Sequence, residues 1–450
     1  MNREGTTVRP TKKLESIGSE LTRSQRRWRW RIFGITWLAY AGFYLCRRNF
    51  SVAMPLLETE LGYSNMQLAN VIFGYSVLYA LGQFCFGSLT DRFGSRVVVS
   101  AGLFLAILSN VLMGLLPTLA ALTVLSCANG LGQSAGWPGL VNNMAPWFRR
   151  RERGVVMGWW TTNYVIGGFL AVLFAAFALT HRTWLAGWGW RRGFWLPALL
   201  LSVIAAAFAL LTRNRPEDAK LPPIADQKEA ALAPACPSAP IRAPFLRVIT
   251  DLEVWVVAMG AVFSKVIRYS FLYWLPVYMT QRLHYSTGQA GYTASLYEFA
   301  GFGGALVAGY VSDRFMKARR LPVAAFMFWG LALMCWIHPQ LAASGHLGLA
   351  LSIALIGVMN YGPDTLLQGA ASQDIGARLG VGTTSGFISG FGSFGQLFSP
   401  YLVAYVAEKY GWDNLFYSFV VISALAGVLL ATQWRRESGL AGVRQTPAAA

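Results

Sequence analysis

Four basic side chains lie inside stretches of the chain that are otherwise apolar: Arg47, Arg48, Lys265 and Arg268. Placing one such group at the middle of a membrane-spanning helix costs about 2.5–3.5 kcal/mol on insertion scales, so a function has to offset the cost. The acidic residues deep within the same stretches are Glu298 and Asp364, which leaves a net positive charge even if both are paired. This pattern predicts a buried binding site for a small anion.

Helical spacing assigns these cations different roles. Neighbouring residues on a helix point about 100° apart, so Arg47 and Arg48 are not expected to face one ligand. Lys265 and Arg268, three residues apart, share a face. If Arg47 is the inward member of its pair, Arg47 and Arg268 meet near the membrane midplane, and Lys265 can join them. Arg48 is then left for an ion pair between helices. The alternative is that all four cations only lock helices together, for which the interior acids are too few.

Long apolar spans are the elements that must position these residues. Of the 450 residues, 55% are hydrophobic and 13% are charged, against about a quarter charged in a soluble domain. Runs of about 20 apolar residues can cross a hydrocarbon core as helices, and none here alternates in polarity as barrel strands would. The sequence predicts an all-α membrane protein with twelve transmembrane helices, at 31–57, 66–89, 96–116, 118–146, 154–180, 191–212, 251–280, 287–312, 320–339, 345–371, 380–408 and 412–434.

The chain also repeats itself. The string GSLTDRFG, from Gly87 to Gly94, returns as GYVSDRF from Gly309. Asp91 and Asp313 are 222 residues apart, and Arg47 and Arg268 are 221 apart. Two unrelated features with nearly one offset indicate a duplicated six-helix unit. We predict a basic tail at 1–30, a first half at 31–212, a polar and proline-rich linker at 213–250, a second half at 251–435 and a tail at 436–450.

The net charge is +18, and the positions of the Lys and Arg residues along the chain indicate how it is oriented in the membrane. Lys and Arg residues outside the spans gather in the two tails, the linker and alternate loops, and the opposite loops hold Arg182, Arg191, Arg192, Arg282 and Lys409. The positive-inside rule then predicts that both termini and the linker are cytoplasmic. We expect the basic surface to face the anionic lipid of the bilayer and not to bind nucleic acid.

Enzyme and metal chemistry lack their usual signals. The five cysteines are scattered without a CxxC pair, and there are four histidines with no metal-ligand spacing. No phosphate-binding Walker loop or nucleophile elbow is present. We expect no enzyme activity, no cofactor and no metal. Short loops, and the lack of a usable glycosylation site, favour a bacterial inner membrane.

The repeated string resembles the loop signature of the major facilitator superfamily, which lies between its second and third helices. This resemblance implies two six-helix halves and a structural role for the loop. Asp91 could accept hydrogen bonds from backbone N–H groups at the start of another helix. The expected conformational latch consists of Gly87, Asp91, Arg92, Gly94, Asp313 and Arg314.

Several further stretches resemble the organophosphate:phosphate antiporters, which include glycerol-3-phosphate and hexose-phosphate permeases. They are Tyr44 to Phe50 with Met54-Pro55, Gly130 to Gln133 with Gly136 to Pro138, Arg268-Tyr269 with Trp274, Tyr297 to Gly301, and Tyr361 to Pro363. The resemblance implies that Arg47 and Arg268 are the phosphate ligands. It also implies an ion pair between Arg48 and Glu298 across the halves.

The chain departs from that family at four positions. Gln83 stands where many members carry lysine, and Tyr164 where glycerol-3-phosphate transporters carry histidine. Lys265 replaces a tyrosine, and Asp364 replaces an apolar residue. These changes leave open whether the solute is a phosphate ester, a phosphonate or a carboxylate.

Polar and aromatic residues near the matched stretches complete the expected site. A phenol hydroxyl can bond a phosphate oxygen while its ring shields the ligand from lipid. We expect substrate contacts from Tyr44, Tyr75, Gln133, Trp137, Trp160, Tyr164, Tyr269 and Tyr361, in addition to Arg47, Arg268 and Lys265.

The function predicted from these features is alternating-access transport of a small anionic solute in exchange for inorganic phosphate, by a monomer. One alternative is a proton-coupled symporter in which Asp364 and Lys265 form a protonatable pair. Another is a membrane sensor of sugar phosphate, because a hexose-phosphate receptor shares the family.

Overall fold

The helices of the first part of the chain follow the predicted spans. The computed structural model describes residues 21–63, 65–180, 186–224, 242–285 and 287–434, and within these ranges it contains helices and no strand. The first bundle consists of α2 (Arg23–Phe43), α3 (Leu45–Leu61), α4 (Asn65–Phe93), α5 (Ser95–Leu115), α6 (Leu119–Ser134), α7 (Gly136–Met144), α8 (Arg153–Trp160), α9 (Thr162–Thr180) and α10 (Arg192–Leu211). Residues 1–20 of the predicted tail at 1–30, residues 225–241 of the predicted linker at 213–250, and the predicted tail at 436–450 lie outside the described residues.

The second bundle has the same kind of elements. After α11 (Arg242–Thr250) it consists of α12 (Leu252–Arg282), α13 (Thr287–Arg314), α14 (Arg320–Ala343), α15 (His346–Thr365), the π-helical turn η6 (Leu366–Ala371), α16 (Ser372–Leu379), α17 (Val381–Tyr410) and α18 (Trp412–Ala431). The predicted all-α class is confirmed. By length and hydropathy, eight of the described helices are able to cross a membrane, so the count of twelve stays a prediction.

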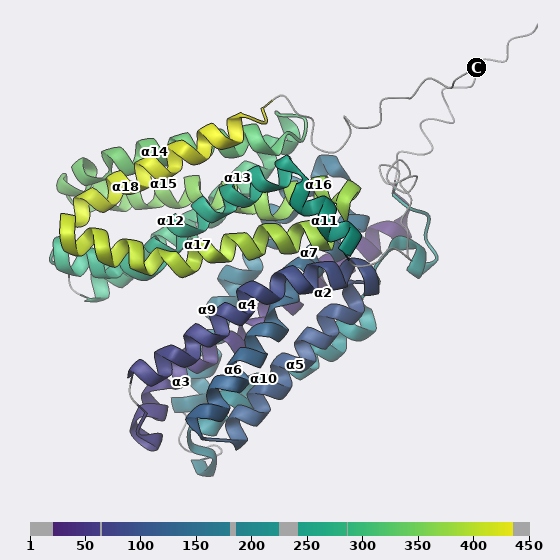
Figure 1. Ribbon diagram of the computed structural model, residues 1–450, viewed down its shortest axis with the longest axis horizontal. Coiled ribbons are helices and arrows are strands. Elements are labelled where there is room, and N and C mark those ends of the chain that lie inside the picture. Colours follow the sequence, from purple (N-terminus) through teal and green to yellow (C-terminus); the bar gives the residue numbers. More distant parts are fainter. Residues whose placement is uncertain (1–20, 64, 181–185, 225–241, 286, 435–450) are drawn as a thin grey trace, which may run out of the picture.

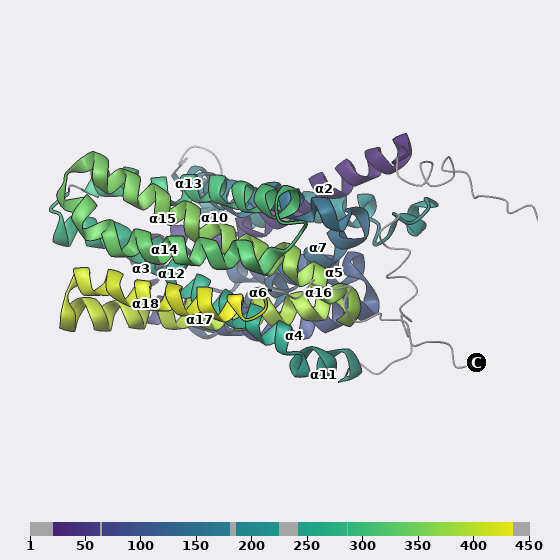
Figure 2. The same cartoon turned by 90° about the horizontal axis from the view of Figure 1, so that it is seen from above.

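The two bundles meet at one end and diverge toward the other (Figure 1). At the end where they meet lie α7 and α16, together with α11 and the first turns of α2, as the turned view also shows (Figure 2). We call this the closed end.

Several predicted spans are interrupted near these cations. Tyr44 separates α2 from α3, and its carbonyl accepts from the N–H groups of both Arg47 (3.1 Å) and Arg48 (2.9 Å). In the second bundle, Pro363 removes a backbone donor late in α15, and the π-helical turn η6 follows. Such turns inside helices often mark functional sites. The interruptions place Arg47 and Asp364 beside irregular backbone.

Glycine lets the bundles approach closely at the closed end. A Cβ on Gly87 of α4 would lie 2.5 Å from the carbonyl oxygen of Gly382 in α17. A Cβ on Gly309 of α13 would overlap the carbonyl oxygen of Gly154 in α8. Gly87 and Gly309 head the two copies of the repeated string, so the duplication supplies a matched pair of close helix crossings.

Candidate functional site

A cavity of about 300 Å³ lies between the bundles, at the lower end of the range for small-molecule sites. Most of its lining comes from the first bundle, and Tyr269, Tyr273 and Gln396 come from the second. Five tyrosines surround it: Tyr44, Tyr75, Tyr79, Tyr269 and Tyr273. Among the described residues that line it, Arg47 and Arg48 are cationic and none is acidic. The cavity is therefore suited to an anion with hydroxyl groups or a flat face.

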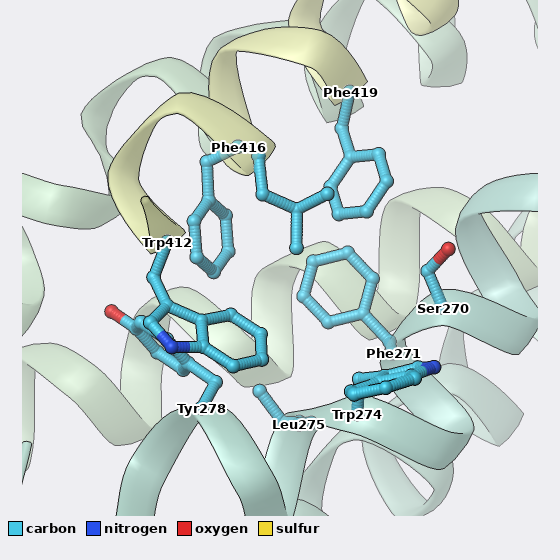
Figure 3. Close-up of a pocket in the computed structure, with 9 residues that line it drawn as sticks. Ser270, Phe271, Trp274, Leu275, Tyr278, Trp412, Phe416 and Phe419 are labelled. Carbon is cyan, nitrogen blue, oxygen red and sulfur yellow. The ribbon is translucent and has the colours of Figure 1, made fainter. Parts of the chain in front are cut away.

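A second pocket is too small for a solute. It measures about 10 Å³ and lies between α12 and α18. Figure 3 shows it enclosed by aromatic side chains such as Phe271, Trp274, Trp412 and Phe416. This pocket belongs to the core of the second bundle.

The side chain of Arg47 is fixed from three directions. Its guanidinium carbon lies 4.7 Å from the ring centre of Tyr44 and 4.8 Å from that of Tyr79. Its Nε donates to Oε1 of Gln133 at 2.7 Å. Its Nη2 is buried and finds no hydrogen-bond partner in the described part of the chain. A buried charged donor without a partner is costly, so a bound anion would remove that cost.

Arg48 lines the same cavity, contrary to the expectation from helical spacing. The backbone break at Tyr44 and the length of the arginine side chain let two neighbouring residues reach one space. Arg48 and Glu298 do not form an ion pair within the described residues, where Glu298 is partly exposed on α13. Their pairing stays a prediction that would need another conformation.

Arg268 lies outside the cavity lining, at the contact between the bundles. Its guanidinium carbon is 4.5 Å from the ring centre of Tyr164 in the first bundle and 4.4 Å from that of Tyr361 in the second. Its Nη1 donates to Oδ2 of Asp364 at 2.6 Å. Its Nε is buried with no partner among described atoms. Like Arg47, it contacts two tyrosine rings and keeps one unused donor.

Lys265 and Asp364 do not form the ion pair expected in the proton-coupled alternative. Nζ of Lys265 donates to the carbonyl oxygen of Ser389 in α17 at 3.3 Å. Asp364 instead binds Arg268, and its other oxygen accepts from Nε2 of Gln368 and, at 3.5 Å, from Oγ of Ser264. Helix packing, which the spacing in the sequence does not reveal, selects the nearer partner.

The remaining expected residues divide into two groups. Tyr44, Tyr75 and Tyr269 line the cavity. Trp137 and Trp160 pack against each other, with ring centres 5.5 Å apart, outside the cavity lining. Tyr79 and Tyr273 were not expected, although each lies four residues after an expected tyrosine. That spacing puts both members of a pair on one helix face and would have identified them.

Gln133 acts on Arg47 and does not line the cavity. Its Oε1 accepts from Nε of Arg47 and, at 3.1 Å, from the hydroxyl of Tyr75. Its Nε2 donates to the carbonyl oxygen of Cys46 at 3.0 Å and to Oδ1 of Asn129 at 3.1 Å. Every hydrogen-bonding position of the amide is used, so Gln133 holds the guanidinium in one orientation.

We expect Gln133→Leu to weaken the binding of phosphate to the purified protein by about tenfold, because Arg47 loses a charge-assisted hydrogen bond that fixes its fork. Titration calorimetry would measure the change. Gln83→Leu is the matched control, because Gln83 is another buried amide that bonds Ser393 and not Arg47. Equal weakening in both variants would show a general effect of losing a buried amide.

A second set of charges joins the bundles at the closed end. The side chain of Asp374 is fully buried. Its carboxylate accepts hydrogen bonds from Nη1 of Arg153 at 2.9 Å and from Nε of Arg320 at 3.0 Å. Nε of Arg150 lies 3.7 Å away. Arg150 and Arg153 belong to the first bundle, and Asp374 and Arg320 to the second. This network was missed, because its arginines were interpreted as topology signals.

Comparison with known proteins decides the family. A sequence profile described as the Major Facilitator Superfamily matches residues 36–384. The chain belongs to the Major Facilitator Superfamily. It is 30% identical over 441 residues to the glycerol-3-phosphate transporter of Bacillus subtilis, covering 95% of this chain and 97% of that one. A probable hexose phosphate transport protein of Chlamydia pneumoniae is 26% identical, covering 94% and 96%. The membrane sensor protein UhpC of Escherichia coli is 27% identical, covering 91% and 92%.

Solved structures of other facilitators show the same fold. The proton:xylose symporter XylE gives a TM-score of 0.68 at 14% identity, covering 91% of this chain and 96% of that one. FucP in an outward conformation gives 0.66 at 13% identity, covering 89% and 98%. The expected resemblance to the organophosphate:phosphate antiporters is confirmed by the relatives named above, and this facilitator is a transporter and not an enzyme.

The repeated string of this facilitator contacts helix ends across the bundles. Asp91 accepts from the backbone N–H groups of Gly382 (2.8 Å) and Thr383 (2.6 Å) in the first turn of α17. Asp313 accepts from the N–H of Val155 in the first turn of α8 at 2.8 Å. Each aspartate therefore caps a helix of the other bundle, where a negative charge is favourable.

The other expected latch residues act differently or stay untested. Gly94, the residue before α5, has φ +81°, a backbone conformation that other residues rarely adopt. Arg92 and Arg314 are exposed, and in the described ranges neither forms an ion pair. Their role in the latch stays a prediction.

Proposed function

We propose that this facilitator moves a small phosphorylated, or similarly anionic, solute across a membrane by alternating access, in exchange for inorganic phosphate. One observation carries the proposal: the cavity between the bundles is lined by two arginines and by no acidic residue among those described. Arginine binds phosphate oxygens through paired hydrogen bonds. The glycerol-3-phosphate and hexose phosphate transporters among the relatives support the same class of solute.

The closed end supplies the conformational part of the mechanism. Asp91, Asp313 and Asp374 hold the bundles together there, while the cavity lies between bundles that diverge toward the opposite end. Release of these contacts would let the bundles rock about the site. We place the closed end in the cytoplasm, on the distribution of Lys and Arg, and the protein in a bacterial plasma membrane as a monomer. In this orientation the cavity faces outward.

Exchange follows from the electrostatics of the empty site. Closing the outer side would exclude water from around Arg47 and Arg48, and like charges repel strongly where water is excluded. A bound phosphate compensates these charges. The empty carrier should therefore change conformation slowly, and each crossing should need an anion.

Reconstitution into liposomes loaded with labelled phosphate tests the proposal. External glycerol 3-phosphate or hexose 6-phosphate should release the label, and a buffer without phosphorylated solute should release much less. Protein-free liposomes are the control. Release that needs a pH gradient, and not an external anion, would contradict exchange and favour proton coupling. Binding of sugar phosphate without any release would indicate a sensor.

A further inference from the structure

Arg268 already binds an anion that belongs to the protein. Nη1 of Arg268 lies 2.6 Å from Oδ2 of Asp364, whose exposure is 2%. Arg47, the corresponding cation of the other bundle, binds the neutral amide of Gln133 and, in the described ranges, no carboxylate. The two equivalent arginines therefore differ in whether a carboxylate of the protein neutralises their charge. Arg47 is uncompensated, and Arg268 is compensated internally.

The two oxygens of Asp364 have different partners, and one of them bonds Arg268. Its Oδ1 accepts from the neutral donors of Gln368 and Ser264, whereas Oδ2 faces Arg268. Lys265 on the same helix as Arg268 donates to Ser389 and adds no bond to the carboxylate. A cargo anion that reached Arg268 would meet this negative charge within a few ångströms, in a space with little water to screen it.

We propose that Asp364 is an internal competitor of the transported anion, holding Arg268 in the empty carrier and leaving Nη1 when cargo binds. This inference rests on the proposed function. Competition from a carboxylate selects cargo that binds a guanidinium more strongly than a carboxylate does. A phosphate group offers two negative charges and three oxygens to the arginine fork, whereas a simple carboxylic acid offers no advantage over Asp364. Asp364 is thus a specificity-determining residue that favours phosphoryl dianions.

The position of Asp364 also suits displacement. It lies directly after Pro363 and two residues before the π-helical turn η6, where the backbone hydrogen-bond pattern of α15 changes. A carboxylate at such a point can move with a small change of the helix backbone. Its neutral donors Gln368 and Ser264 would retain it after it leaves Arg268.

Calorimetric binding of inorganic phosphate, glycerol 3-phosphate and glycerate to purified wild type and Asp364→Asn tests the proposal. Asparagine keeps the shape and removes the charge. We expect Asp364→Asn to bind each anion about tenfold or more tightly than wild type, with the larger gain for glycerate, so that discrimination against the carboxylate falls. A purely structural role for the ion pair predicts weaker binding instead, so the sign of the change separates the two.

Asp413→Asn is the matched control. Asp413 pairs with Arg282 of the same helix as Arg268, at 3.1 Å, but on the exposed surface. It should leave all three affinities unchanged. Asp364→Glu should restore wild-type affinities, and Asp364→Ser should repeat the gain if the asparagine variant does not fold.

The outcomes distinguish this inference from the proposed function. Phosphate binding by wild type, with equal or weaker binding by folded Asp364→Asn and Asp364→Ser, would overturn the inference and leave the transporter proposal standing. Lack of binding of all phosphorylated probes by wild type would overturn the proposed function, and the inference with it.

Discussion

Purified Arg47→Lys is expected to fold normally and to bind phosphate at least about tenfold more weakly than wild type. Lysine keeps the charge but loses the planar fork, which now contacts the rings of Tyr44 and Tyr79 and donates Nε to Gln133. Each charge-assisted hydrogen bond lost costs about 1.5–3 kcal/mol. That loss corresponds to a tenfold change or more in the dissociation constant.

Two further variants sharpen this test. Arg268→Lys should also weaken binding, because ammonium cannot give paired hydrogen bonds while contacting Tyr164 and Tyr361. Arg48→Lys should weaken binding as well, because Arg48 lines the same cavity as Arg47. Near-normal phosphate affinity in both Arg47→Lys and Arg268→Lys, measured by calorimetry on monodisperse protein, would remove the two arginines from the site.

The second large effect is expected from Asp374→Asn, which should open the closed end. Removing one partner from a buried ion pair costs about 3–5 kcal/mol, because the remaining charges stay buried without compensation. Asp374 of the second bundle compensates Arg153 and Arg150 of the first, so the cost applies to the conformation in which the bundles meet. About 5.5 kcal/mol would reverse a 99:1 population completely, so a loss of about 3–5 kcal/mol should move a large fraction of the molecules out of this conformation.

Spin labels at Phe93 and Ala377, exposed residues of α4 and α16, would report the change. They follow Asp91 and Asp374, which contact the other bundle. The distribution of distances between them should shift to longer values in Asp374→Asn. Asp413→Asn should leave it unchanged, because its exposed ion pair contributes about 0–1 kcal/mol. An unaltered distribution in Asp374→Asn would show that the network does not hold the bundles together.

The helical class and the internal repetition follow from the sequence alone. A chain that crosses lipid must satisfy its own backbone hydrogen bonds, so long apolar runs become helices whatever their neighbours are. The nearly equal offsets of Arg47 to Arg268 and of Asp91 to Asp313 indicate the duplication directly. The capping role of Asp91 was predictable, because a negative charge near a helix start is favourable in any setting.

The partners of the charged residues were decided by the tertiary structure. Spacing along one helix placed Arg48 away from the ligand, yet Arg48 lines the cavity. The proton-coupled alternative paired Asp364 with Lys265, yet Asp364 binds Arg268. Arg153 and Arg320 showed only a topological pattern in the sequence, and packing brought them to Asp374. Which ion pair forms depends on the distance between the side chains and on their burial, and the helices that carry them are far apart in the chain. Those quantities exist only once the helices have packed against one another.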